Sequence, residues 1–131
     1  MEDMHKVLLS IGSNTKACSN MSKAEELLRS CFPTIKFTDV IETKPYGEKY
    51  TAPFLNSLAY LEADLNRNEV VRKLKAIERK MGRIASHKSD GIVIIDIDLI
   101  KWNNKVLKPD DMERSYMPEL LLKIDKIISC L

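Results

Sequence analysis

The chain has 131 residues and a mass of 15.0 kDa, which is enough for one domain with its own hydrophobic core and too little for two ordinary domains. Hydrophobic residues make up 44% of the chain and charged residues 31%, the balance of a soluble globular protein. The formal net charge is only +2 and the basic residues are scattered, so we expect no nucleic-acid partner. The sequence predicts a single domain over residues 1–131.

The sequence pattern contains no membrane or export signal. No apolar stretch approaches the roughly 18 residues of a membrane span, and the apolar run at residues 7–9 is too short for the core of a signal peptide. The cysteines Cys18, Cys31 and Cys130 are an odd set without Cys-x-x-Cys spacing, so neither a disulfide framework nor a zinc site is indicated. We expect a cytoplasmic protein with no membrane partner.

The first half of the chain predicts two strands separated by a helix. Residues 6–11 form a short apolar strand, which the Gly-Ser-Asn triplet at 12–14 closes as a turn. Ser22 and Glu25 have the spacing of a capping box, which predicts a helix over residues 22–31. Residues 35–43 alternate imperfectly and predict a second strand, followed by a loop at 44–50.

The second half predicts a strand, a helix, a hairpin and a last helix. Residues 54–65 form the third strand, and apolar residues spaced by three and four from Val70 to Met81 predict an amphipathic helix that ends at Gly82. Residues 83–90 read as a surface loop. The Asn103-Asn104 turn joins strands 92–102 and 105–107 as a hairpin. Pro118 opens a helix whose buried stripe is Leu121, Ile124, Ile128 and Leu131.

The resulting order is β, α, β, β, α, β, followed by a small hairpin and a C-terminal helix. This order predicts an α+β fold of the ferredoxin-like kind, an antiparallel sheet with helices on one face. A fold of this kind serves many functions, so function has to be argued from the residues of a site.

The strongest candidate site lies in the apolar run at residues 91–100, which carries Asp96 and Asp98. Strand side chains alternate with period two, so both carboxylates project from one face. An ionised carboxylate removed from water needs a partner, and two adjacent ones repel each other. A Mg²⁺ ion relieves both costs and is commonly held by one or two carboxylates together with substrate phosphates. A half-exposed edge strand with solvated acids is the alternative, and the residues alone leave both interpretations open.

Five short blocks occur together in the order and spacing of one family: Ile-Gly-Ser-Asn at 11–14, Thr-Lys-Pro-Tyr-Gly at 43–47, Phe-Leu-Asn at 54–56, Ile-Glu-Arg-Lys-Met-Gly-Arg at 77–83 and Ile-Asp-Ile-Asp-Leu at 95–99. Over about residues 6–107 the chain resembles the 6-hydroxymethyl-7,8-dihydropterin pyrophosphokinases of folate biosynthesis. The resemblance implies transfer of the β,γ-diphosphate of ATP to the hydroxymethyl group of a reduced pterin, with release of AMP and participation of two Mg²⁺ ions.

The resemblance also implies roles for individual residues. Asp96 and Asp98 would hold both metal ions and act with Arg83 in catalysis. ATP would be bound near Lys75, Glu78 and Lys88, although charges on a helix are more often a solvated face. The pterin pocket would be formed by Thr43, Pro45, Tyr46, Phe54 and Asn56. Within that set an aromatic ring can stack on the flat heterocycle and the Asn56 amide can donate and accept along its edge.

The chain departs from the family pattern just before the acid pair. The family's Trp-Gly-Pro-Arg-Thr run reads Asp-Gly-Ile-Val-Ile at residues 90–94, so Asp90 replaces the tryptophan expected over the pterin and Val93 replaces an arginine expected on the triphosphate. Ala85 stands at another arginine position, and the downstream Pro-His motif is absent, since residues 115–119 read Ser-Tyr-Met-Pro-Glu.

These departures matter because one arginine on a transferring phosphoryl group is worth roughly 10³ or more in rate. Three hypotheses follow from the sequence. The chain is a divergent pyrophosphokinase, a non-catalytic relative that binds a pterin or nucleotide, or a protein whose acid pair serves another phosphoryl substrate.

Overall fold

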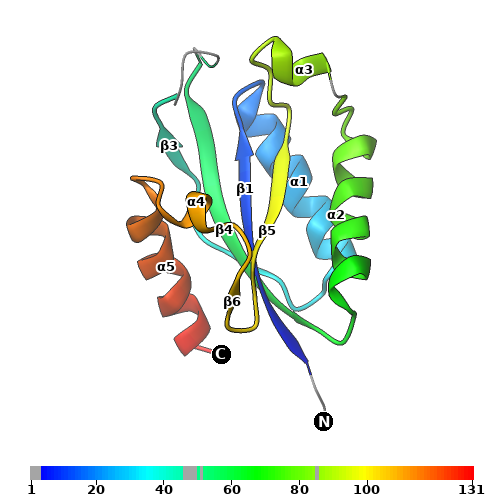
Figure 1. Ribbon diagram of the computed structural model, residues 1–131, viewed down its shortest axis with the longest axis vertical. Coiled ribbons are helices and arrows are strands. Elements are labelled where there is room, and N and C mark those ends of the chain that lie inside the picture. The colour runs from blue at the N-terminus through cyan, green and yellow to red at the C-terminus, as the bar shows by residue number, and fades with distance from the viewer. Residues whose placement is uncertain (1–3, 46–49, 51, 85) are drawn as a thin grey trace.

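The computed structural model describes residues 4–45, 50, 52–84 and 86–131. In these residues the chain forms, in order, β1 (His5–Ser13), α1 (Ala17–Cys31), β2 (Lys36–Phe37), β3 (Ile41–Thr43), β4 (Phe54–Ala63), α2 (Arg67–Lys80), α3 (Ser86–Ser89), β5 (Asp96–Trp102), β6 (Lys105–Val106), α4 (Pro109–Met112) and α5 (Met117–Ser129) (Figure 1). None of the described helices combines the length and apolar character that crossing a bilayer requires.

The strands form one antiparallel sheet with β1 at its centre. The order is β2-β4-β1-β5-β6, and β3 pairs with β4 on the same edge as β2. The helix α1 connects β1 to the β2 edge, and α2 precedes β5 on the other side of β1. The predicted α+β fold with a ferredoxin-like strand order is therefore confirmed.

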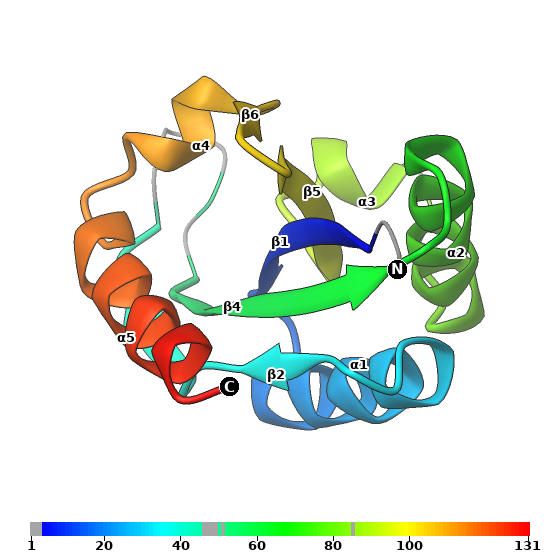
Figure 2. The same cartoon turned by 90° about the horizontal axis from the view of Figure 1, so that it is seen from below.

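Alternating side chains divide the sheet into two apolar faces. Val7, Leu9 and Ile11 of β1 point to one face and pack with buried residues of α1 and α2. Leu8 points to the other face, where Tyr60 and Ile100 pack against α5. Figure 2 shows α1 and α2 together on one side of the sheet and α5 apart from them. The C-terminal helix thus covers the face opposite the two predicted helices.

The helix ends differ from the sequence prediction at α1. This helix starts at Ala17, after Lys16 in the left-handed conformation with φ 44°, and no capping box forms at Ser22. The apolar stripe begins one turn earlier than expected, because Met21 is buried in the same core as the residues that follow it. The capping box occurs instead at the start of α2, where Asn66 and Glu69 each accept from the backbone N–H of the other.

Four boundaries were predicted incorrectly near the site. β1 continues through Ser13, so Gly12 lies within a strand and not in a turn. Residues 35–43 contain two short strands, β2 and β3. Between them the Thr38 hydroxyl accepts a hydrogen bond from the Leu58 N–H. The segment 83–90 contains α3, and β5 begins only at Asp96.

The residues before β5 are held by a side chain. Asn14 Oδ1 accepts from the Val93 N–H at 2.7 Å, and Asn14 Nδ2 donates to the Gly91 carbonyl at 2.9 Å. These bonds satisfy backbone groups that a longer β5 would have paired within the sheet. The predicted hairpin is confirmed, with Asn103 at φ 53° in the turn between β5 and β6.

Candidate active site

The register of the sheet aligns the polar side chains of three strands. Gly12 of β1 lies opposite Asn56 of β4 on one side and Asp96 of β5 on the other. Ser10 lies opposite Asp98. All of these positions lie on the face of the sheet that carries α5. They are at one end of the strands, and α5 covers the other end. The uncovered end of this face is the candidate site.

Gly12 leaves room for the Asn56 amide. A Cβ at Gly12 would lie 2.8 Å from Asn56 Oδ1, closer than side-chain atoms normally approach. Asn56 is only 6% exposed, and its Nδ2 donates to Thr43 Oγ1 at 2.6 Å. The absence of a side chain at Gly12 and the bond to Thr43 together fix the orientation of this amide.

Asp96 and Asp98 project into one cleft, as the alternation of β5 predicts. The pKa of Asp98 is raised to about 7, first by burial and then by the negative charge of Asp96 and a hydrogen bond between the two carboxyl groups, while Lys108 opposes the rise. The ammonium of Lys108 is 4.0 Å from Asp98 Oδ1, which is too long for a hydrogen bond. The pair therefore carries repulsion that the nearby cations do not remove.

This donor set fits a divalent cation. Two carboxylates that share a face and repel each other gain most from a small ion of high charge, and oxygen ligands are those that Mg²⁺ prefers. The described residues hold no group of three or more His, Cys, Asp or Glu side chains with metal-binding geometry. Any ion bound here would thus need further oxygen ligands from a substrate or from water.

Glu78 of α2 and Arg83, which follows the end of α2, support the acid pair. Arg83 Nη1 donates to Glu78 Oε2 at 2.6 Å and to Asp96 Oδ1 at 2.9 Å. Glu78 is 3% exposed, and its Oε2 also accepts from the N–H of Ile97, the residue between the two acids, at 2.8 Å. Burial lowers the pKa of Arg83, but the charges of Glu78 and Asp96 outweigh this effect and raise it overall. Arg83 is consequently charged and oriented onto Asp96.

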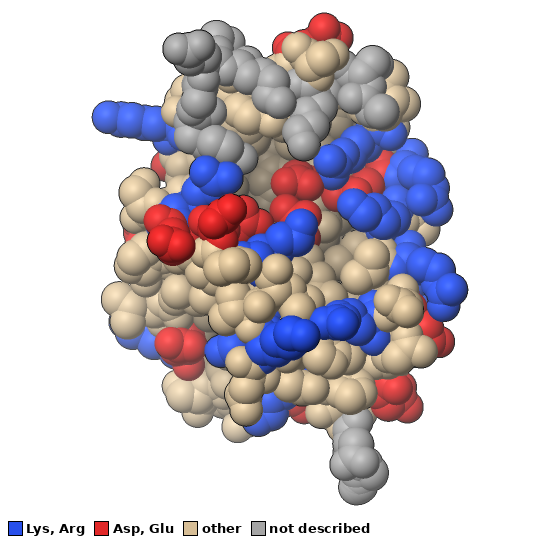
Figure 3. All heavy atoms as spheres, viewed as in Figure 1, with Lys and Arg blue, Asp and Glu red and all other residues tan. Residues whose placement is uncertain are grey.

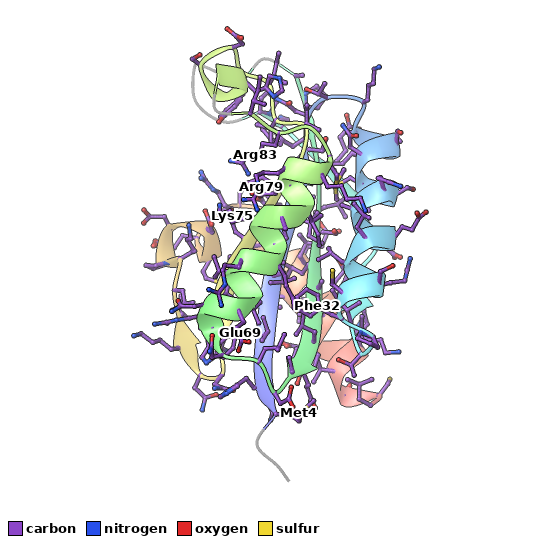
Figure 4. All side chains as sticks on the ribbon, turned by 90° about the vertical axis from the view of Figure 1, so that its right-hand side faces the viewer. Met4, Phe32, Glu69, Lys75, Arg79 and Arg83 are labelled. Atoms are coloured by element: carbon purple, nitrogen blue, oxygen red, sulfur yellow. The ribbon has the colours of Figure 1, made fainter. Side chains whose placement is uncertain are left out.

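The cleft has a volume of about 750 Å³ and combines charged and apolar walls. Its lining includes Tyr50, Phe54, Lys75, Arg83, Ile84, His87, Ile92, Val93, Asp96, Asp98, Leu107, Lys108, Pro109, Asp110, Asp111 and Arg114. Figure 3 shows Asp and Glu side chains gathered near the centre of this face, with Lys and Arg side chains on both sides of them. In Figure 4, Lys75 and Arg79 of α2 and Arg83 just beyond its end follow one another on the side nearer α4.

Two smaller hollows adjoin the cleft. The first, which we call the side groove, has a volume of about 260 Å³ and runs between α2 and the β5–β6 hairpin, with Val71, Leu74, Leu99 and Leu107 among its lining. Lys75, Asp98 and Lys108 line both the side groove and the cleft. The second, which we call the recess, lies over Gly12 and Asn56 beside both acids.

The structure brings together most of the residues that the sequence singled out. Phe54 and Asn56 lie with Asp96 and Asp98 at the recess, and Thr43 adjoins them through Asn56. Lys75 lines the cleft, and Pro45 is half-buried two residues beyond Thr43. Tyr46 and the side chain of Lys88 lie outside the described residues.

Glu78 requires a correction. The sequence analysis placed it among residues that bind ATP, but its carboxylate is buried beneath the cleft and is occupied by Arg83 and the Ile97 N–H. The apolar spacing of α2 did not reveal this, because the contact depends on where β5 packs against the helix. Glu78 therefore supports other site residues from below.

Several lining residues were missed by the sequence analysis. Lys108, Asp111 and Arg114 come from the segment around α4, which no family block covers and which lacks a periodic pattern. Tyr50 also lines the cleft and packs edge-on against Phe54, with ring centroids 5.3 Å apart. The local signal for this segment was the spacing of Asp111 and Arg114, which are three residues apart. In the structure their charged groups are 3.8 Å apart.

The fold and the site define an α+β domain whose antiparallel sheet carries an acid-lined cleft at one end. The family described as 7,8-dihydro-6-hydroxymethylpterin-pyrophosphokinase (HPPK) matches residues 8–126 of this chain. The chain belongs to that family, and the resemblance found in the sequence is confirmed.

Curated relatives agree with this assignment. A 2-amino-4-hydroxy-6-hydroxymethyldihydropteridine pyrophosphokinase of Porphyromonas gingivalis is 35% identical over 100 residues, covering 72% of this chain and 67% of that protein. The protein of the same name from Aquifex aeolicus is 31% identical over 106 residues, covering 80% of this chain and 66% of that protein. The folic acid synthesis protein FOL1 of Dictyostelium discoideum is 31% identical over 110 residues, covering 82% of this chain and 16% of that protein. The chain thus spans about two thirds of the bacterial relatives and a small part of the Dictyostelium protein.

Proposed function

We propose that this chain is a Mg²⁺-dependent pyrophosphokinase of folate biosynthesis, which transfers the β,γ-diphosphate of ATP to 6-hydroxymethyl-7,8-dihydropterin. The observation that carries the proposal is the placement of Asp96 and Asp98 beside the Gly12–Asn56 recess in one cleft. Such a site can hold a metal–polyphosphate next to a flat heterocycle. Membership in the pyrophosphokinase family supports the choice of reaction.

The hollows suggest how the two substrates are arranged. The side groove has apolar walls that suit an adenine ring, and it meets the cleft at Lys75, Asp98 and Lys108, where the phosphates cross. The pterin lies over the recess with its edge toward the Asn56 amide. Phe54 and Tyr50 provide aromatic surface beside it.

The acid pair would hold the metal, and the other residues of the site orient it. Asp96 and Asp98 would bind Mg²⁺, two ions in the family pattern, which when bound neutralise phosphate charge and favour loss of the hydroxymethyl proton. Arg83, just after the end of α2, donates to the Asp96 carboxylate at 2.9 Å. Glu78 fixes the Ile97 backbone between the two acids, so their separation is set before substrates arrive.

The transfer is a single displacement at phosphorus. The hydroxymethyl oxygen forms a bond to the β-phosphorus, the bond from that phosphorus to the α,β-bridging oxygen breaks, and AMP leaves with the bridging oxygen and its electron pair. The hydroxyl proton passes to water in the cleft. The protein contributes mainly alignment and positive charge, because this chemistry needs little covalent participation from side chains.

A second candidate function is a pterin- or nucleotide-binding module with little or no turnover. The observation that favours it is Val93, an apolar side chain lining the cleft at the position where the family pattern has a phosphate-binding arginine. A pocket with Asn56 and the acid pair would still bind ligands without that arginine, while catalysis would fall steeply.

The deciding experiment measures AMP release from ATP and Mg²⁺, with and without the hydroxymethyl pterin. The enzyme hypothesis requires AMP that depends on the pterin and is lost in Asp96→Asn. Calorimetry with the pterin then tests the pocket. Asn56→Ala should weaken binding by roughly tenfold or more, whereas Asn104→Ala in the hairpin turn should not. Pterin binding without AMP at high protein concentration would favour the binding module, and neither binding nor AMP would refute both.

A further inference from the structure

Helix α2 concentrates positive charge beside the cleft. It carries six cations and two acids, which are Arg67, Arg72, Lys73, Lys75, Arg79 and Lys80 against Glu69 and Glu78. The helix thus has a net charge of +4, whereas the whole chain has a net charge of +2, so the rest of the chain has a net charge of −2. The small net charge of the molecule therefore conceals one strongly basic element.

The exposed cations of α2 divide between two sides of the helix. At 3.6 residues per turn, Arg72, Lys75 and Arg79 lie on one side, and Lys73 and Lys80 are centred roughly 120° further around the axis. Lys75 marks the side of the cleft, because it lines both the cleft and the side groove. In Figure 4, Arg79 lies with Lys75 on the side nearer α4. We call Arg72, Lys75 and Arg79 the basic stripe.

Arg72 and Arg79 are the members of the basic stripe that lie outside the walls of the cleft. Both are exposed, and neither is among the described residues that line the cleft or the side groove. Lys75 is 3.6 Å from Glu78 Oε1, but no carboxylate of a described residue pairs with the side chain of Arg72 or Arg79. The charges of these two arginines are therefore not neutralised locally.

Both arginines are close enough to act on an anion at the mouth of the cleft. Along the helix axis, Arg72 is about 4.5 Å and Arg79 about 6 Å from Lys75. These separations are shorter than the Debye length of about 10 Å at 0.1 M salt. Figure 3 shows Lys and Arg side chains over α2, next to the acidic centre of this face. An anion that approaches Lys75 is thus attracted by the whole basic stripe.

The other sides of the cleft offer an anion less attraction. Arg83 donates to two carboxylates, so its charge is balanced. The α4 segment, residues 108–114, contains three acids and two cations. An approaching polyphosphate also meets the negative charge of the pair Asp96 and Asp98. The attraction that brings a polyanion to this cleft therefore comes mainly from α2.

We propose that Arg72 and Arg79 speed the association of the nucleotide by electrostatic steering, without touching it in the bound state. The ligand class is a nucleoside polyphosphate, whose several negative charges respond to the field of the basic stripe before any contact forms. This inference rests on the proposed function, because it takes a nucleoside triphosphate as the ligand. It goes further by assigning the rate of entry to residues outside the contact surface.

Steering and direct contact predict different effects of substitution. The double variant Arg72→Gln with Arg79→Gln removes two charges, so the association rate constant should fall roughly fivefold at low ionic strength. The dissociation rate constant and kcat at saturating ATP should stay within about twofold, because no bound contact is lost. The double variant Arg72→Lys with Arg79→Lys keeps both charges and should associate like the wild type. A lysine could not replace a guanidinium that held phosphate with two parallel donors.

The matched control is the double variant Lys73→Gln with Lys80→Gln, which makes the same charge change on the other side of the same helix. Gln, Lys and Arg have similar helix propensities, so all variants should fold, and thermal unfolding checks this. Stopped-flow mixing with Mg²⁺ and mant-labelled α,β-methylene-ATP, which cannot transfer its diphosphate, measures both rate constants. Trp102 is the only tryptophan, so energy transfer from it to the mant group reports binding.

The measurement is made at ionic strengths of about 0.02 M and about 0.5 M, where the Debye length is about 20 Å and about 4 Å. We expect the fivefold loss in the arginine-to-glutamine variant at the lower ionic strength only, and association within about 1.5-fold of the wild type in the lysine control. Equal losses in both glutamine variants would show an effect of net charge alone and overturn the inference. A change confined to dissociation, or no rescue by lysine, would show direct contact and also overturn it.

The proposed function fails separately. Should the wild type bind the analogue and release AMP while the arginine-to-glutamine variant associates normally, only the steering inference is overturned. Should the wild type neither bind the analogue nor release AMP, the proposed function is overturned and the steering inference with it.

Discussion

Replacing Glu78 tests how the acid pair is held in place. Its carboxylate is 3% exposed and accepts hydrogen bonds from Arg83 at 2.6 Å and from the Ile97 N–H at 2.8 Å. In the described part of the chain, β6 pairs with β5 only at Lys101 and Trp102. At Ile97 the outer edge of β5 is therefore covered by a side chain from α2 in place of a strand. Glu78→Ala removes that cover.

The magnitude follows from the two contacts that are lost. An Ile97 N–H left without its acceptor costs about 1–3 kcal/mol. Breaking a fully buried ion pair costs about 3–5 kcal/mol, but the Arg83 side chain is 33% exposed and keeps Asp96 at 2.9 Å. We expect Glu78→Ala to lower the free energy of unfolding by about 2–4 kcal/mol. Glu78→Gln keeps an amide oxygen for Ile97 and should cost about 1–2 kcal/mol.

Urea denaturation followed by circular dichroism measures these differences. The control is Glu26→Ala on α1, an exposed acid whose ion pair with Lys23 is 3.5 Å long, for which we expect a change within about 0.5 kcal/mol. If Glu78→Ala unfolds within that range of the wild type, the carboxylate does not support β5. If Glu78→Gln loses as much as Glu78→Ala, charge and not the hydrogen bond to Ile97 is what matters.

Two further predictions concern the recess and the acid pair. Gly12→Ala puts a methyl group 2.8 Å from Asn56 Oδ1, so the Asn56 amide has to turn. Calorimetry should then show a pterin affinity lower by roughly tenfold or more. Unchanged affinity would contradict this role for Gly12. The raised pKa of Asp98, about 7, means that the folded state binds this proton more tightly than the unfolded chain, so stability without divalent cation falls as the pH rises from about 4 to about 7. Asp98→Asn removes this pH-dependent loss of stability, so the Tm of the variant should depend less on pH across that range than the Tm of the wild type. Equal dependence of Tm on pH in both proteins would show that Asp98 does not titrate there.

The acid pair was predictable because its geometry is local. A period of two along β5 is enough to place Asp96 and Asp98 on one face, whichever strand lies beside them. The amphipathic spacing of α2 and the Asn103 turn are local in the same sense, and both are observed. Sequence patterns within one element therefore determined much of the fold.

The misplaced features depend on residues far apart in the chain. The triplet at residues 12–14 has the composition of a turn, yet Gly12 is extended because Asn56 and Asp96 pair with it from both sides. Glu78 reads as a solvated helix position until β5 packs against it and presents the Ile97 N–H. Such positions are fixed by strand register and helix packing, which no short window of sequence contains.

The departures from the family pattern at residues 92 and 93 change the polarity of the cleft. Ile92 and Val93 make one part of its lining apolar, and Asn14 holds this part through the Val93 N–H at 2.7 Å. Charged residues of α2 and the α4 segment line other parts. A polyanion is stabilised where cations can reach it and desolvated where they cannot. If the proposed function holds, we expect the phosphates to lie on the side of Lys75 and Lys108 and away from Ile92 and Val93.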